Sequence, residues 1–474
     1  MIERAGSIFL DFSRSRLLDT DFNDFLDNDK PRVASFIDRM VNGDLVNNTE
    51  RRGAAHFATR GIYSSYENVS NQMKEILSFV DIFHQGGIIG FKEIRNVINV
   101  GIGGSYLGPE MLHRALSVSY PNLLVTRFVS NLDPVSFQRG TSDLRPEETL
   151  VIFCSKTFTT METLVNLELF TDWFNSAGIS PFEHSIAVTS NPNAAAEIGF
   201  KSTNIFEFDV NIGGRFSVTS SVGLVIALSF GVKVFKDLLN GGALIDSIVF
   251  EDSTETKIFY RHLFEFLGNR KVLKSNTVAV LPYCDALDRF PAYLQQLFME
   301  SLGKSVDTHG DSVGNAGPVI IGEVGTSAQH SFMQYLHQGI ETIPAEFIVI
   351  KPPKDKYYSI YRQLALNAIA QANALSDGDR DSAIRPDGLL DGHRVIPGNR
   401  PSTLVILEDL SANSLGQLIA WYENLVIALG AAWNINPFDQ FGVELGKRLA
   451  RELDGSTDKI TDPNLRSLFD VLEI

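Results

Sequence analysis

Cysteine is nearly absent from this sequence of 474 residues, which contains only Cys154 and Cys284. Two cysteines are too few for a disulfide framework, and their separation matches no metal-binding spacing. A small secreted protein held together by disulfides is therefore excluded. The scarcity of cysteine fits a reducing compartment, and we expect a cytoplasmic protein.

Long apolar runs are also missing. The most apolar segment that we identify, residues 222–235, is interrupted by Lys233 and is too short to span a bilayer. Near the N-terminus the short run from Ile8 to Leu10 is broken by Asp11 and Arg14, which does not fit a signal peptide. We expect no membrane association.

Basic residues are outnumbered, with 41 Lys and Arg against 57 Asp and Glu, so the net charge is −16. This charge argues against nucleic acid or an anionic membrane as a partner. An anionic ligand must then be bound by local cations and helix N-termini. The length allows two or three domains with cores of their own.

Short strand-like runs alternate with helical ones in two regions, which predicts an α/β protein with parallel sheets. The expected strands are 97–101, 123–130, 149–155 and 184–189, followed by 277–282, 319–322 and 347–350. The expected division is an N-terminal helical segment at 1–75, a first sheet domain at 76–235, a helical connector at 236–275, a second sheet domain at 276–435 and a C-terminal helical arm at 436–474.

One glycine-rich stretch, residues 96–109, combines a β-branched run with glycines and a helix start. Its glycines allow the backbone amides to approach a ligand, and the N-terminus of the following helix favours an anion. Tyr106 occupies the last glycine position of a dinucleotide fingerprint, and no Gly-Lys-Ser/Thr follows as in a Walker A loop. The stretch favours a phosphorylated small molecule; a tight turn without a ligand is the alternative.

A second loop, Cys154-Ser-Lys-Thr-Phe-Thr-Thr160, also follows an apolar strand and precedes a helix. Parallel strands end at the same sheet edge, so these hydroxyls can lie near Ser105 and help to bind a phosphate. Taken alone, Ser and Thr at this position would more often cap the helix.

Two further segments carry side chains suited to stabilising charge or to acid–base chemistry. Arg215 follows two glycines and can present a planar cation to an oxyanion, although a surface arginine is the alternative. Gln296 and Glu300 are four residues apart, so they share one face of a predicted helix. Glu300 is a candidate general base, and the alternative is a solvated glutamate.

The remaining candidates are His330, Gln440 and Lys447. His330 can exchange a proton near pH 7 and has no metal-ligand spacing around it, so an ordinary core or surface histidine is the alternative. Gln440 and Lys447 are seven residues apart, which would place them on one face of a helix. A lone lysine there would ordinarily face solvent.

Together these motifs closely resemble the glucose-6-phosphate isomerase family over nearly the whole chain. The segments that carry the resemblance, in chain order, are N-x-T-E-x-R at 47–52, G-I-G-G-S-x-L-G-P at 101–109, S-K-T-F-T-T at 155–160, G-G-R-F-S at 213–217, Q-Q-x-x-M-E-S at 295–301, G-T-x-x-Q-H at 325–330 and F-D-Q-x-G-V-E-L-G-K at 438–447.

The resemblance implies two sugar-isomerase (SIS) domains, which are flavodoxin-like αβα sandwiches, with N- and C-terminal arms. It implies a homodimer with shared active sites that interconverts glucose 6-phosphate and fructose 6-phosphate without a metal or cofactor, by ring opening and a cis-enediol(ate) proton transfer. A non-catalytic sugar-phosphate sensor and another phosphosugar isomerase are the alternatives.

The resemblance also assigns roles to residues. Glu300 would be the base, Arg215 the stabiliser of the enediolate, and His330 of the partner subunit would assist ring opening together with Lys447. The substrate-binding residues it implies are Gly104, Ser105, Ser155, Lys156, Thr157, Thr160, Gly214, Gln296 and Gln440. The chain departs from the family pattern at Tyr106, Leu302, Val324 and Ala328, and none of these departures removes a catalytic group.

Overall fold

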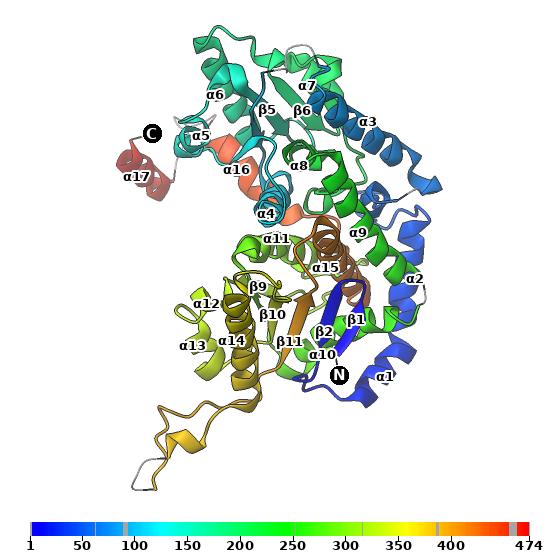
Figure 1. Cartoon of the computed structure of the whole chain (residues 1–474), viewed down its shortest axis with the longest axis vertical. Helices are drawn as coiled ribbons and strands as arrows, with labels where there is room; N and C mark the ends of the chain where they lie inside the picture. The colour runs from blue at the N-terminus through cyan, green and yellow to red at the C-terminus, as the bar shows by residue number, and fades with distance from the viewer. Residues whose placement is uncertain are drawn as a thin grey trace.

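Two β-sheets, each flanked by helices, lie at opposite ends of an elongated molecule (Figure 1). This computed structural model describes residues 2–61, 63–88, 93–251, 253–314, 316–384, 388–454 and 462–473. The two sheets and the helices on them confirm the predicted α/β class.

The first sheet has five strands, all parallel, in the order β4-β3-β5-β6-β7. This is the flavodoxin-like order, in which the connections reverse direction beside β3; in such sheets ligands bind outside the carboxyl ends of the strands at the reversal point, here β3 and β5. Its strands are β3 (Asn96–Val100), β4 (Val125–Val129), β5 (Thr149–Cys154), β6 (Ser185–Thr189) and β7 (Ile205–Glu207). Its helices are α3 (Glu67–His84), α4 (Leu107–Leu116), α5 (Pro134–Thr141), α6 (Met161–Ser176), α7 (Pro192–Ile198) and α8 (Leu224–Phe230).

The second sheet has six strands in the order β1-β2-β11-β10-β8-β9. Its four parallel strands repeat the order of the first four strands of the other sheet. They are β8 (Thr277–Tyr283), β9 (Val319–Gly322), β10 (Ala345–Ile350) and β11 (Ser402–Leu407). The helices on this sheet are α10 (Thr256–Leu273), α11 (Phe290–Leu302), α12 (Gly325–Ala328), α13 (Met333–Gln338) and α14 (Tyr358–Asp377).

The two remaining strands of this sheet, β1 and β2, correct two expectations, that the sheet is parallel and that the N-terminal segment is helical. β1 (Ile2–Ala5) and β2 (Ile8–Asp11) form an antiparallel hairpin, and β2 pairs antiparallel with β11. The second sheet is therefore mixed, and a wholly helical N-terminal segment is wrong. The reason is that β2 is only four residues long, and its buried Ile8 and Leu10 find their partner strand in a distant part of the sequence.

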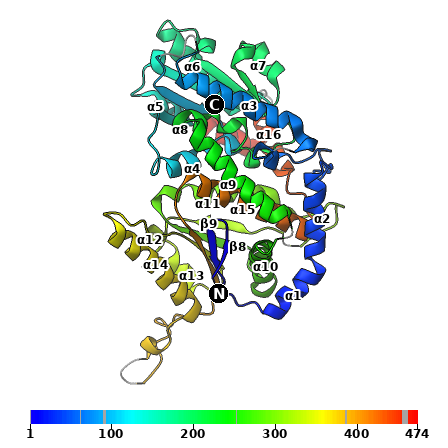
Figure 2. The same ribbon diagram turned by 45° about the vertical axis from the view of Figure 1, so that its right-hand side comes forward.

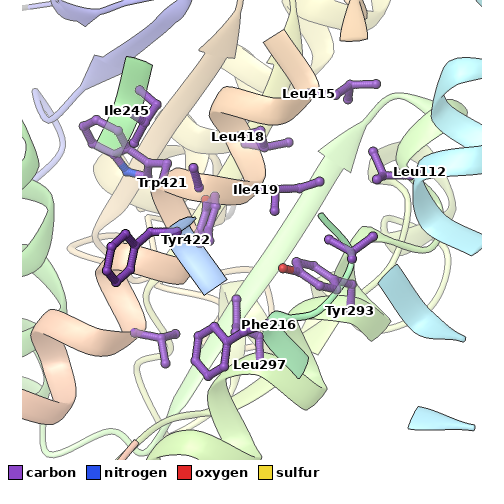
Figure 3. Packing of buried hydrophobic residues seen from close by; sticks show 14 of the residues in the cluster. Leu112, Phe216, Ile245, Tyr293, Leu297, Leu415, Leu418, Ile419, Trp421 and Tyr422 are labelled. Atoms are coloured by element: carbon purple, nitrogen blue, oxygen red, sulfur yellow. The ribbon is translucent and has the colours of Figure 1, made fainter. Parts of the chain in front are cut away.

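The helices α9 (Val232–Phe250) and α15 (Ala412–Ala432) pack together between the two sheets (Figure 2). Among the described residues α15 is the one helix long and apolar enough to cross a membrane, but it is almost entirely buried in the protein core. Figure 3 shows its Leu415, Leu418 and Ile419 in the same apolar cluster as Tyr293 and Leu297 of α11. The core is thus continuous across both halves.

Helices also border the chain ends. α1 (Asp19–Asn28) and α2 (Lys30–Val41) follow the N-terminal hairpin, and α16 (Glu444–Asp454) and α17 (Pro463–Leu472) lie near the C-terminus. After α14 the described parts of residues 378–400 form a narrow projection with antiparallel bridges, visible at the bottom of Figure 1. The five-part division of the chain stays a prediction.

Candidate active site

The two phosphate-loop candidates lie at the carboxyl ends of adjacent strands, β3 and β5, at the reversal point of the first sheet. A Cβ added to Gly104 would lie 2.0 Å from the carbonyl oxygen of Gly214. The glycine-rich loop therefore touches the segment that carries Arg215, and only glycine fits at this contact. Asn99 is buried under the loop, and its side-chain Nδ2 donates to the backbone carbonyl of Ser105 at 2.9 Å.

The hydroxyl loop is organised around the buried Ser155. Ser155 Oγ donates to Thr160 Oγ1 at 3.0 Å and accepts from the Phe158 amide at 3.2 Å. Thr160 is the N-cap residue of α6 but makes no side-chain cap hydrogen bond. The exposed Thr157 hydroxyl lies 2.7 Å from that of Thr159. Helix capping thus does not account for these hydroxyls, which supports a ligand-binding loop.

Lys156, from the same loop, has a different set of contacts. Its ammonium group donates to the carbonyl oxygens of Val210 at 2.9 Å and Ile212 at 3.0 Å. The structure therefore ties this side chain to the backbone that precedes Arg215, while Ser155 and Thr160 contact each other.

Arg215 is buried, with 3% of its surface exposed, so the alternative of a surface arginine is wrong. Its Nε donates to Ser301 Oγ at 2.6 Å, and Nη2 donates to the carbonyls of Pro437 at 2.6 Å and Asp439 at 3.1 Å. Burial lowers the pKa of Arg215 from its usual value, while the charge of Glu300 opposes this change. The guanidinium is thus fixed as a planar cation.

Glu300 lies beside this cation. Arg215 Nη1 is 3.3 Å from Glu300 Oε2 and also donates to Gln440 Oε1 at 2.8 Å. The predicted helix is α11, and Gln296 Nε2 lies 3.3 Å and 3.4 Å from the two carboxylate oxygens of Glu300. The side chain of Glu300 is 32% exposed, so its carboxylate is held by the protein and still accessible.

A cavity of about 520 Å³ opens beside Glu300 and Gln440. This volume is within the range of small-molecule sites. Lys304 and Asp439 also line it, and Lys304 Nζ lies 3.1 Å from Asp439 Oδ1 and donates to the Glu300 carbonyl at 2.8 Å. Lys304 therefore holds the end of α11 against the segment that contains Gln440.

Among the described residues, neither His330 nor Lys447 makes a hydrogen bond or ion pair with Arg215, Glu300 or Gln440. His330 is exposed in the turn between α12 and α13, and the described residues include no hydrogen-bond or ion-pair partner for its imidazole. Lys447 is exposed on α16, with Nζ 3.1 Å from Glu444 Oε1. The expectation that Gln440 and Lys447 share one helix face is wrong, because Gln440 precedes a short 3-10 turn and α16 begins only at Glu444.

Asn99, Ser301, Lys304 and Asp439 belong to the site's framework but were not predicted from the sequence. Ser301 and Asp439 lie inside quoted motifs, and adjacency to Glu300 and Gln440 is the signal that could have identified them. Asn99 lies in the glycine-rich stretch, six residues before its partner Ser105, and Lys304 lies four residues after Glu300, but no residue pattern predicts these side-chain-to-backbone contacts.

Comparisons with known proteins agree with this geometry. The model of the family "Phosphoglucose isomerase" matches residues 11–467. A glucose-6-phosphate isomerase from Roseiflexus castenholzii is 39% identical, over 95% of this chain and 86% of that protein. One from Dechloromonas aromatica is 37% identical, over 92% and 85%. The crystal structure of a glucose-6-phosphate isomerase from Chlamydia trachomatis superposes with a TM-score of 0.89 at 32% identity, covering 99% of this chain and 93% of that one.

With its two sheets, its paired loops at the reversal point and the Arg215–Glu300 pair, the chain belongs to the phosphoglucose isomerase family.

Proposed function

We propose that this chain interconverts glucose 6-phosphate and fructose 6-phosphate, with Glu300 as the base that moves the proton between C2 and C1. The observation that carries the proposal is the pairing of Glu300 with the buried Arg215 at 3.3 Å. A carboxylate can accept the C2 proton, and a fixed guanidinium beside it can stabilise the negative charge of the enediolate.

The phosphate of the substrate binds where the two loops meet. Hydroxyl groups for this site come from Ser105, Ser155, Thr157 and Thr160. The backbone at Gly104 and Gly214 can approach the phosphate closely, because neither residue has a side chain. Anchoring the phosphate there fixes the remote C1–C2 end near Glu300 and Gln296, and such positioning lowers the barrier of the proton transfer.

Ring opening needs a proton donor at the ring oxygen and an acceptor at the C1 hydroxyl. His330 of the partner subunit and Lys447 fill these roles in our proposal, and Gln440 contacts the substrate. The exposure of His330 and Lys447 supports this assignment, since neither is committed to a buried structural contact within the described chain.

The protein acts as a homodimer. Exposed apolar residues gather on α14 and at its N-cap, and include Tyr357, Tyr358, Ile360, Tyr361, Leu366 and Ile369. Apolar residues of α16 and α17 are exposed as well, among them Leu445, Leu449, Leu468, Val471 and Leu472. Exposed apolar surface of this extent favours a partner surface. We also propose that the protein is cytoplasmic, since free cysteines such as Cys154 and Cys284 persist in that reducing compartment.

A coupled assay tests the activity: fructose 6-phosphate is supplied and glucose 6-phosphate is detected, with EDTA present and no added metal. Turnover under these conditions is the expected result. Tight binding of sugar phosphate without turnover would instead identify a sensor, and turnover that EDTA abolishes would contradict a reaction without metal.

A further inference from the structure

The Lys156 side chain bridges two loops of the first half of the molecule. Its backbone stands at the carboxyl end of β5, where its carbonyl accepts from the Ser190 amide at 3.1 Å, the Ser190 hydroxyl at 2.9 Å and the Thr189 hydroxyl at 3.1 Å. Its ammonium donates to Val210 and Ile212 at 2.9 and 3.0 Å. The backbone of Lys156 is therefore anchored at the end of the sheet, and its ammonium group is anchored to the loop at residues 210–212.

The segment that Lys156 binds is also held from its other side. The Ala55 amide donates to the Asn211 carbonyl at 3.1 Å, and the Gly53 amide donates to Asn211 Oδ1 at 3.1 Å. Residues 210–212 are thus clamped between the N-terminal segment and Lys156, directly before Gly213, Gly214 and Arg215.

Charged groups surround the ammonium. Burial lowers the pKa of Lys156 to about 8, and Arg52 and Arg215 lower it too, while Glu50 and Asp209 raise it. Two of its three N–H groups are already bound to carbonyls. The group is therefore integrated into the protein rather than offered as a free cation to a phosphate.

We propose that Lys156 is a positioning residue that fixes the backbone of Arg215 relative to the phosphate loop. The guanidinium of Arg215 is held by residues of the second half, such as Ser301 and Gln440, whereas the backbone of residues 210–212, directly before Gly213, is held by Lys156 in the first half. Lys156 thereby sets the spacing between the phosphate site and the Arg215–Glu300 pair. This inference rests on the role proposed for Arg215.

Kinetics of Lys156→Met, Lys156→Arg and Ser155→Ala test the inference, with inorganic phosphate as the competitive probe. In Lys156→Met the misplacement of Arg215 should lower kcat by about 10- to 100-fold. The inhibition constant of phosphate for this variant should change by less than about threefold. Ser155→Ala, which removes a proposed phosphate contact, should weaken phosphate binding by about 10-fold or more. Lys156→Arg keeps a cation that can reach the carbonyls and should restore most of kcat.

Hydrogen exchange supplies a readout that does not depend on activity. Amides of residues 209–217 should exchange faster in Lys156→Met than in wild type, and at the wild-type rate in Ser155→Ala. If Arg215→Met retained full turnover, the catalytic role proposed for Arg215 would be wrong. The exchange measurement would still test whether Lys156 holds residues 210–212. Unchanged exchange in Lys156→Met, or a loss of phosphate affinity of 10-fold or more at unchanged kcat, would overturn the inference.

Discussion

Two polar side chains lie beside the Glu300 carboxylate: the Arg215 guanidinium at 3.3 Å and the Gln296 side-chain amide at 3.3 Å. Replacing it with glutamine keeps its size and removes its ability to accept the C2 proton. We predict that Glu300→Gln lowers kcat by roughly 10²-fold or more while the substrate still binds.

Exchange of the substrate's C2 proton with deuterated solvent should disappear together with turnover. Glu168→Gln, an exposed substitution on α6, is the matched control and should behave as wild type. Near-normal turnover of Glu300→Gln would rule out Glu300 as the base.

A second acid, Glu423 of α15, lies in the core with Asp246, and both bind the buried Arg60. Tyr293 of α11 and Asn424 complete the group. Two carboxylates share one guanidinium, and burial raises the pKa of Glu423 from 4.5 to about 7, with Asp246 adding to the increase and Arg60 opposing it.

The folded state therefore binds a proton at Glu423 more tightly than the unfolded chain does. Through this group the free energy of unfolding falls as the pH rises from 4.5 to 7, by about 3 kcal/mol at most. We predict that Glu423→Gln removes this decrease, as measured by urea unfolding at several pH values between 5 and 8. Identical pH slopes for variant and wild type would contradict the shifted proton affinity, and Glu168→Gln again serves as the control.

At the scale of elements, the contact between the glycine-rich loop and the Arg215 segment has no room for a side chain. A Cβ at position 104 would lie 2.0 Å from Gly214 O and 2.7 Å from the Arg215 amide nitrogen, and both are backbone atoms. We predict that Gly104→Ala pushes the two loops apart and lowers kcat by about 10-fold or more, since small displacements of catalytic groups are costly.

The measurement pairs steady-state kinetics with a thermal unfolding curve, so that lost activity is separated from lost folding. Gly392→Ala is the control, because a Cβ there meets nothing within 4 Å. Wild-type kinetics in Gly104→Ala would show that the loops can separate without consequence.

The elements that could be predicted are those with local signals. The β-branched run before Gly101 predicted β3, and the spacing of Gln296 and Glu300 predicted their contact on α11. β2 could not be predicted in the same way, because it is four residues long and pairs with the equally short β1 and with β11, which is distant in the sequence. Gln440 was placed on a helix by spacing alone, yet its contact with Arg215 comes from an irregular segment. The motif resemblance indicated which residues gather, whereas their hydrogen bonds depend on tertiary packing.

At the scale of the whole molecule, an active site shared between two subunits leads to a prediction that can be tested only with dimers. If His330 serves the partner's site, mixing His330→Ala with Glu300→Gln and allowing subunits to exchange should restore activity. In the mixed dimer one site carries both lesions and the other carries none, so up to about half of the wild-type activity is expected per mixed dimer.

The control pairs two lesions that belong to the same subunit's site. Glu300→Gln mixed with Arg215→Met leaves one lesion in every site and should recover nothing. Mixed dimers of His330→Ala and Glu300→Gln that form and stay inactive would place His330 in the site of its own subunit.

The antiparallel strand β2 also bears on how this protein is made. Its partner β11 is synthesised on the order of 400 residues later, so at about 5–20 residues per second the first strand waits roughly 20–80 s for its place in the sheet. During most of synthesis the N-terminal hairpin therefore exposes the edge of β2 that later pairs with β11. We expect this edge to be the part of the nascent chain that most needs protection against pairing with another chain.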